Sequence, residues 1–392
     1  MNGQYIIYRR DRATGIRDTI VERFTSFSIT LHWGELSKFS MKGKTIGEVE
    51  VQPGDGIVFY RNREYFFSGI VSTVTIKCSD VASGLKEWSA EGYEDSVIFS
   101  NWLAFADPES ITFNDGIVDK CEDYAWNRLL YYIRRNMGAD ALTDREISGL
   151  TLPDAANKGQ NTESAYRYQE LDKVLEEIGK EVDGDDVPNE LFPRFVWDPD
   201  TGAKSVIIPE QRDMTESIVV APEFGNIINW TKKETLPSCN AVWVCSGTAD
   251  DTRLYVYQKD DDSIDKYGRI EKVVTKSDIQ VTDDVTQSEV YTLLNAEAKK
   301  TLTEGAYKEK FSGTMVETPE LQFMSHWRCG DLVSCMIDGH KFQTTIKTVE
   351  IAFADGFEQV KPTLGETEHG IFADVFRTLK GLDDRMNKEE LS

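Results

Sequence analysis

Two stretches of this chain, residues 53–76 and residues 329–351, share one pattern. Each begins with Gly-Asp and continues with an apolar run, a short polar turn and a second apolar run. Aligned without a gap, the stretches coincide at these positions: Gly54-Asp55 with Gly330-Asp331, Phe66 with Phe342, and Ile70 with Ile346. Two β-rich runs around a short polar turn are typical of a β-hairpin. The sequence therefore predicts two similar β-units, one near each end of the chain.

The β character extends over residues 1–95. Polar and apolar residues alternate over residues 26–31 and again over residues 48–52, which is the pattern of a half-buried strand. Further strands are expected at residues 5–8 and 87–93. We therefore predict that residues 1–95 form the first β-domain.

Residues 96–189 change to a helical or α+β pattern, which predicts an insertion. One helix, capped by Asn114 or Asp115 and stopped by Gly138, has these apolar positions: Val118, Cys121, Ala125, Leu129 and Ile133. A second helix, capped by Thr162 or Ser164, has these: Tyr168, Leu171, Val174, Leu175 and Ile178.

Residues 190–222 return to β, as a connection or as strands that complete a barrel. Two short runs flank the turn of residues 198–202, whose carboxylates favour a tight turn, with a calcium site as the alternative. Residues 223–366 hold the second β-unit. Within it we expect paired strands at 240–244 and 254–257, a solvated acidic loop at 260–262, a helix from about 286 to 304 and a strand at 349–353.

Residues 367–392 are predicted to form a C-terminal helix. Apolar residues spaced four, four, three and four apart resemble about two heptads of a coiled-coil seam; they are Ile371, Val375, Leu379, Leu382 and Met386. Such a helix either packs on its own domain or meets copies of itself on a symmetry axis.

The charge balance limits the partners. The 392 residues carry a net charge of −24, with 68 acidic and 44 basic side chains. That balance excludes a general nucleic-acid-binding surface, which needs basic patches. It is compatible with a wall along which DNA slides without sticking. We see neither a membrane-spanning segment nor a signal peptide, so we expect synthesis in a cytoplasm and free thiols.

No catalytic pattern emerges. The four histidines lie outside metal-binding spacings, and no Gly-x-Ser-x-Gly elbow is present. Gly43-Lys44-Thr45 has Lys38 where a phosphate-binding loop needs glycine. His326 and Cys329 lie near each other in sequence, but a buried apolar thiol is the favoured interpretation. We predict no enzyme, no catalytic, cofactor-binding or metal site, and no cofactor.

The order of motifs in the second β-unit resembles that of bacteriophage tail-tip hub proteins. These are the siphophage proteins related to baseplate hubs and to the N-terminal structural part of tail-associated lysins. The motifs, in chain order, are Phe224-Gly225-Asn226-Ile227-Ile228, Asn240-Ala241-Val242-Trp243-Val244, Tyr267-Gly268-Arg269, Gly330-Asp331-Leu332-Val333 and Lys361-Pro362-Thr363-Leu364-Gly365. The resemblance is strongest over residues 220–365.

This resemblance implies a homotrimer in which each subunit carries two tube-like β-barrel domains, at residues 1–95 and 223–366. Six barrels then adapt a six-fold tail tube to a three-fold tip. The implied partners are a distal tail protein or tail tube protein above, and a spike, fibre or receptor-binding protein below. The lumen holds the tape measure protein and later passes DNA during ejection, without binding it specifically. The implied location is the tail tip of the virion, after tail assembly in the host cytoplasm.

Two other functions remain open. Eight tryptophans and fifteen tyrosines are compatible with a receptor- or glycan-binding tail-tip protein. A cell-wall hydrolase is the third possibility, although the chain ends without the long C-terminal extension of many tail-associated lysins.

Overall fold

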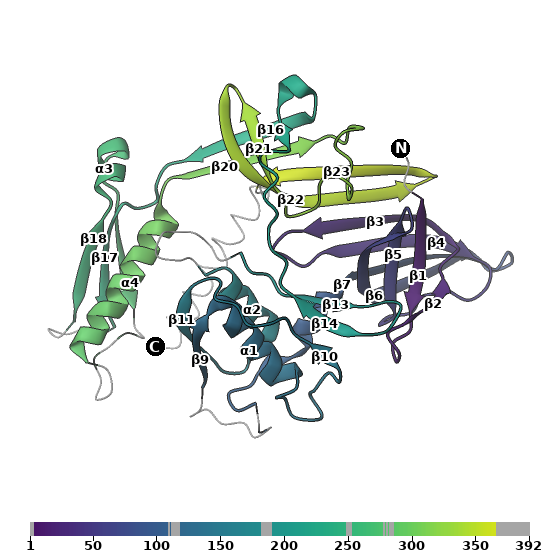
Figure 1. The fold of residues 1–392 in the computed structure, drawn as a ribbon, viewed down its shortest axis with the longest axis horizontal. Helices are drawn as coiled ribbons and strands as arrows, with labels where there is room; N and C mark the ends of the chain where they lie inside the picture. The colour runs from purple at the N-terminus through teal and green to yellow at the C-terminus, as the bar shows by residue number, and fades with distance from the viewer. Residues whose placement is uncertain are drawn as a thin grey trace. The chain divides into compact units, whose positions relative to one another are not determined.

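The computed structural model describes residues 4–108, 110, 118–181, 190–247, 253–276, 279, 281 and 286–365 (Figure 1). Over these residues the chain is mainly β, as the sequence predicts, with 23 strands, four α-helices and two short 3-10 helices. The predicted C-terminal helix lies outside the described residues. Two compact units are present: one contains the chain up to Asn229 together with Gly313–Gly365, and the other contains Trp230–Ser312. The finer five-part division stays a prediction.

The elements of the first unit fall into three groups. The N-terminal group is β1 (Tyr5–Arg10), β2 (Arg17–Ile20), β3 (Phe24–His32), β4 (Lys38–Thr45), β5 (Gly56–Arg61), β6 (Glu64–Asp80), β7 (Leu85–Glu94) and η1 (Asp95–Asn101). The inserted group is β8 (Leu103–Ala104), β9 (Asp119–Tyr124), α1 (Ala125–Met137), β10 (Leu150–Thr151), β11 (Asn161–Tyr166), β12 (Gln169–Glu170), α2 (Leu171–Gly179), β13 (Arg194–Trp197) and β14 (Lys204–Ile207). The C-terminal group is β15 (Val219–Val220), η2 (Pro222–Phe224), β16 (Ile227–Thr235), β20 (Lys308–Met315), β21 (Leu332–Ile337), β22 (His340–Ala354) and β23 (Phe357–Gly365); β16 and β20 lead into the second unit.

One sheet of 13 strands carries both predicted β-units. Its main path runs β16-β20-β23-β22-β3-β4-β7-β6-β5-β1-β2, and β21 branches from β22 to reach β15. The yellow β22–β23 hairpin lies beside the purple β3 in Figure 1, where β22 and β3 pair antiparallel from Thr348↔His32 to Ala354↔Ser26. The expectation of two closed barrels was therefore wrong for the described strands, because this pairing joins the two β-units edge to edge in an open sheet.

Both predicted hairpins are confirmed, at β5–β6 and β21–β22. In each, two residues with positive φ make the turn, Asn62 (53°) and Arg63 (69°) in the first and Asp338 (51°) and Gly339 (79°) in the second. Positive φ at both central positions defines a type I′ turn, whose twist matches that of the strands it joins. The alternating pattern at residues 48–52 was misleading, because this segment forms a loop in which Val51 is buried.

Aromatic side chains fill the inner face of the sheet where β3 and β22 meet. The rings of Phe27 and Phe353 stack at a centroid distance of 5.4 Å, and Phe59 packs against Phe27 at 5.3 Å. Phe39 and Phe67 extend the cluster from neighbouring strands. Alternation along each strand sends these residues inward, so the seam between the two β-units is a continuous hydrophobic core.

The inserted group has its own core, in which α1 and α2 pack with β13, β14 and η1. Helices are present where predicted, but both begin later than the sequence suggested. Residues 119–124 and 161–166 are instead the paired strands β9 and β11. The apolar positions that suggested a longer first helix therefore belong partly to a strand, and Gly138 is confirmed as the stop.

The second unit contains β17 (Ala241–Ser246), β18 (Tyr255–Lys259), α3 (Asp261–Tyr267), β19 (Glu271–Lys276) and α4 (Gln287–Gly305). The predicted pairing of β17 with β18 is confirmed. Helix α4 starts as expected, with a capping box in which Thr286 and Glu289 bond reciprocally. The expected loop at 260–262 was wrong, because the Asp260 side chain caps α3. Among the described helices, none is long and apolar enough to cross a bilayer.

Candidate functional site

The two Gly-Asp motifs form the same corner in each β-unit. In the first, the Gly54 amide donates to the Val71 carbonyl (2.7 Å) and the Val71 amide donates to the Asp55 carbonyl (2.9 Å). In the second, Gly330 and Asp331 make the same two bonds with Ile346, both at 2.9 Å. Each corner therefore holds the middle of the long second strand of its hairpin, β6 or β22.

The aspartate side chains repeat as well. The Asp55 carboxylate accepts the Gln52 amide at 2.8 Å, and the Asp331 carboxylate accepts the Arg328 amide at 2.7 Å. An arginine from an earlier segment supports Asp331, since Arg212 donates to both of its oxygens at 2.8 and 2.6 Å. A carboxylate can cap a backbone amide only three residues away when its side chain is short, as that of aspartate is. This explains why Gly-Asp is the shared sequence signal.

The equivalence continues along both halves of the sheet. From the hairpin outward, the first half runs β5-β6-β7-β4-β3 and the second runs β21-β22-β23-β20-β16. A β-bulge lies at the same place in both, between Val71 and Thr73 of β6 and between Ile346 and Thr348 of β22. A shared strand order with a shared irregularity indicates two copies of one β-unit.

One repeat escaped our sequence analysis. Lys38-Phe39-Ser40 of β4 recurs as Lys310-Phe311-Ser312 of β20, 272 residues later. The same offset places Gly92 of β7 on Leu364 of β23, and these residues pair with Val71 and Ile346 respectively. The gapless alignment of the hairpins uses an offset of 276, so it missed a match that insertions had displaced. It also placed Ile70 on Ile346, whereas in the structure Val71 is the equivalent of Ile346, because a bulge adds one residue to β6 between Tyr65 and Phe67.

The outer face of the sheet combines small hydroxyl side chains with exposed lysines and glutamates. One cross-strand row contains Ala352, Ser28, Ser40, Glu91 and Thr73. The Ser28 and Ser40 hydroxyls lie 3.0 Å apart, and the Ser72 hydroxyl donates to the Glu91 carbonyl at 3.0 Å. Because the inner face holds the aromatic core, this hydroxyl-rich face is turned toward solvent, and a hollow of about 410 Å³ lies over Ser28, Ser40, Ser72 and Glu91.

A buried ion pair locks the two copies together. Arg61, at the end of β5, donates to Glu358 of β23 at 2.7 and 3.1 Å, and the pair is almost fully buried. The Tyr5 hydroxyl also donates to Glu358, and burial followed by this carboxylate raises the pKa of Tyr5. Removing either charge leaves the other buried without its counter-charge, which is costly.

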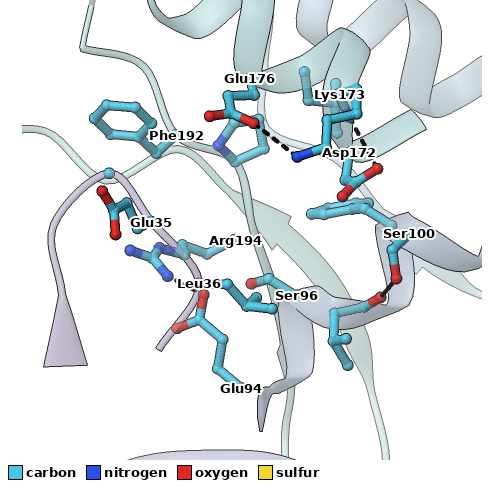
Figure 2. A pocket seen from close by; sticks show the side chains of 15 residues that line it. Glu35, Leu36, Glu94, Ser96, Ser100, Asp172, Lys173, Glu176, Phe192 and Arg194 are labelled. Atoms are coloured by element: carbon cyan, nitrogen blue, oxygen red, sulfur yellow. Dashed lines mark hydrogen bonds and ion pairs between the residues drawn. The ribbon is translucent and has the colours of Figure 1, made fainter. Parts of the chain in front are cut away.

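A cavity of about 350 Å³ opens between the 34–36 loop, η1, α2 and the segment before β13 (Figure 2). Arg194 and Glu94 pair at its edge, and Arg194 also donates to the His32 carbonyl at 2.8 Å. Burial raises the pKa of Glu94, while Arg194 opposes that shift. Arg194 therefore ties the insertion to the sheet.

His326 and Cys329, which the sequence raised as a nucleophile and base, each have structural partners of their own. The Nδ1 atom of His326 accepts the Gln322 amide at 2.9 Å, whereas the Cys329 thiol lies 3.6 Å from the carbonyls of Ile346 and Lys347. Burial raises the pKa of Cys329 to about 12, which keeps the thiol protonated at neutral pH. The Cys329 side chain is half-buried, which is less than the fully buried apolar thiol that the sequence favoured.

The acidic turn at 198–202 is held by its own backbone. The Asp198 carboxylate accepts the amides of Asp200 and Thr201 at 2.9 and 2.8 Å, and Asp200 pairs with Arg17 at 2.7 Å. Residues 11–15 make the same Asp-x-x-Thr-Gly turn, in which Asp11 caps two amides. In the part of the chain that the structure describes, no group of three or more His, Cys, Asp or Glu side chains is arranged to hold a metal ion.

The fold is that of solved phage tail proteins. A 43 kDa tail protein of prophage MuSo2 from Shewanella oneidensis is 10% identical with a TM-score of 0.56, covering 92% of this chain and 97% of that one. A tail protein from Neisseria meningitidis MC58 is 12% identical with a TM-score of 0.52, covering 92% and 96%. A model of the family described as Siphovirus ReqiPepy6 Gp37-like protein matches residues 17–366, and the chain belongs to that family. No curated protein matches the sequence. The resemblance to siphophage tail proteins is therefore confirmed.

Proposed function

We propose that this chain is a structural hub of a phage tail tip. In this role a homotrimer adapts the six-fold tail tube to the three-fold tip and surrounds the channel through which DNA is ejected. The observation that carries the proposal is the internal duplication. Two copies of one β-unit per chain give six similar units in a trimer, which is the number that a six-fold tube presents.

The charge pattern on the outer face of the sheet supports the channel role. The lysines of this face are interspersed with glutamates, and Lys44 pairs with Glu87 at 2.8 Å, which leaves less unpaired positive charge to attract phosphates. The net charge of −24 further disfavours attachment of DNA. The tape measure protein and then DNA are the proposed occupants of this lumen. We assign the chain no enzymatic step.

The proposed partners follow from the position in the tail. A distal tail or tail tube protein binds above the hub, and a spike, fibre or receptor-binding protein binds below. The inserted group and the second unit are the parts available for such contacts, because the duplicated sheet forms the ring. The proposed location is the virion tail tip, after assembly in the host cytoplasm.

Imaging of the purified protein by negative-stain electron microscopy tests the proposal. End-on class averages are expected to show a three-fold ring with six lobes around a central hole. Elongated monomers at high protein concentration, or rings of another symmetry, would contradict a trimeric hub.

One surface favours the alternative of glycan or receptor binding. On the face of β17 and β18 opposite α4, the rings of Trp243 and Tyr257 lie 4.5 Å apart, and Trp243 is 42% exposed. Tyr255 and Val273 extend this aromatic face. Exposed aromatic rings with polar neighbours are suited to stacking against sugars. A glycan array with wild-type protein and a Trp243→Ala variant tests this: specific binding that the substitution removes would favour the alternative over the hub.

A further inference from the structure

The two copies of the β-unit differ in what lies beside their long strand. Along β22, the residues after Ile346 pair with β23 on one edge and with β3 on the other. Along β6, the residues after Val71 pair with β7 on one edge. Since Gly69 and Ile70 pair with both β5 and β7, these two strands lie on opposite edges of β6. The edge on the β5 side is thus left without a strand over residues 72–77, among the strands that the structure describes.

The occupied edge of β22 shows what fits the open edge of β6. The matching bulges align Thr73 with Thr348, and so Lys77 with Ala352. Ala352 pairs with Ser28 of β3. A strand at the open edge of β6 would therefore place its equivalent of Ser28 opposite Lys77. The strand that belongs at this edge is therefore an equivalent of β3.

The equivalent of β3 in the second copy is β16. Each of these strands follows β4 or its counterpart β20 in the sheet order. The same bond marks where each begins: the Lys44 amide donates to the Arg23 carbonyl, just before β3, and the Val316 amide donates to the Asn226 carbonyl, just before β16. β3 has a bulge between Phe24 and Ser26. We take β16 to share this bulge, and the match then places Thr231 of β16 on Ser28 of β3.

β16 is the last strand at its end of the sheet order. Among the described strands of one chain, none pairs with its outer edge in the way that β22 pairs with β3. Both edges carry apolar side chains toward solvent, with Ile76 of β6 53% exposed and Trp230 of β16 39% exposed. A long edge strand exposed in this way is a template for pairing with another chain. The internal β22–β3 pairing supplies the geometry for that pairing.

We propose that β16 of one copy pairs antiparallel with residues Ser72–Lys77 of β6 in the next copy, with Thr231 opposite Lys77. The inference rests on the proposed trimeric hub, and it names the surfaces that close the ring. The contact is heterologous, because β6 of one subunit meets β16 of its neighbour, and three such contacts close a cyclic trimer. Within each chain the β22–β3 seam repeats the same contact, so six equivalent seams alternate around the ring.

A cysteine pair tests the register. In a Cys78→Ser background, Lys77→Cys with Thr231→Cys places both thiols on one face across the seam, where opposed Cβ atoms lie about 4.5–5.5 Å apart. Mild oxidation is expected to give disulfide-linked dimers and trimers on non-reducing gels. The matched control is Ile76→Cys with Thr231→Cys, since a one-residue slip points the side chains to opposite faces. Equal cross-linking by both pairs, or none by the first, overturns the inference.

A charge substitution tests the edge without thiols. Ile76→Lys adds a charge where its counterpart Ile351 is fully buried against β3. The substitution is expected to weaken association tenfold or more by mass photometry, which corresponds to about 1.4 kcal/mol for each contact. Ile207→Lys is the control, because Ile207 is an exposed strand isoleucine of the insertion. Trimers that resist Ile76→Lys are held by another surface.

The outcomes separate the inference from the hub proposal. Six-lobed rings without the Lys77–Thr231 cross-link refute the strand pairing and leave the hub standing. Cross-linked chains that form open filaments support the pairing and refute the hub. A wild-type chain that stays monomeric and does not cross-link at any concentration refutes both.

Discussion

Arg10 and Asp95 form a buried ion pair that joins β1 to η1. Arg10 donates to the two Asp95 oxygens at 2.8 and 2.6 Å, and the side chains are only 3% and 2% exposed. The Ser68 hydroxyl donates to the same carboxylate, and the Arg10 guanidinium lies 4.5 Å from the ring centroid of Trp197. Asp95→Ala therefore leaves a cation and a hydroxyl buried without their acceptor.

Removing one partner of a buried pair costs about 3–5 kcal/mol. We expect Asp95→Ala to lower the free energy of unfolding by that amount, measured by urea titration with far-UV circular dichroism. The control is Asp18→Ala, which breaks an Arg9–Asp18 pair whose side chains are 32% and 35% exposed. An exposed pair contributes less than about 1 kcal/mol.

The double variant Arg10→Met with Asp95→Leu separates the ion pair from packing. It is expected to lose less stability than Asp95→Ala alone, because no charge is left buried. The reasoning is refuted if Asp95→Ala costs no more than Asp18→Ala, or if the double variant is the least stable of the three.

Three further predictions concern the corners, a histidine and a helix cap. Gly330→Ala is expected to destabilise the chain more than Gly339→Ala in thermal melts. Both glycines have positive φ (95° and 79°), so both substitutions strain the backbone. Only at position 330 does the added Cβ also collide with a side chain, that of Trp33, at 2.2 Å. Burial lowers the pKa of His32 below its usual 6.5, so stability is expected to fall as pH drops through about 6.5, and His32→Gln should flatten that dependence in pH-resolved melts. Thr286→Ala removes the cap of α4 and is expected to cost about 1 kcal/mol in urea unfolding, while the neighbouring exposed Gln287→Ala should cost less than half of that.

Local patterns in the sequence located the parts that depend on neighbouring residues. The hairpin turns followed from short polar segments between β-rich runs, and the start of α4 followed from its cap. The sequence located helices α1 and α2 but predicted that both begin too early, because the segments just before them, residues 119–124 and 161–166, are strands. The Lys-Phe-Ser repeat was missed because insertions between strands changed the offset from 276 to 272.

The chain's own sequence determined that a β-unit occurs twice, because each copy needs glycine at a positive-φ corner and aspartate to cap the backbone beside it. What only the tertiary structure decided is how the copies meet. Pairing of β22 with β3 joins residues more than 300 positions apart, and its register depends on bulges and on an aromatic seam whose members lie on different strands. Such contacts are set by the packing of whole strands, so no local pattern encodes them. The same contact, repeated between chains, is the one we propose to close the ring.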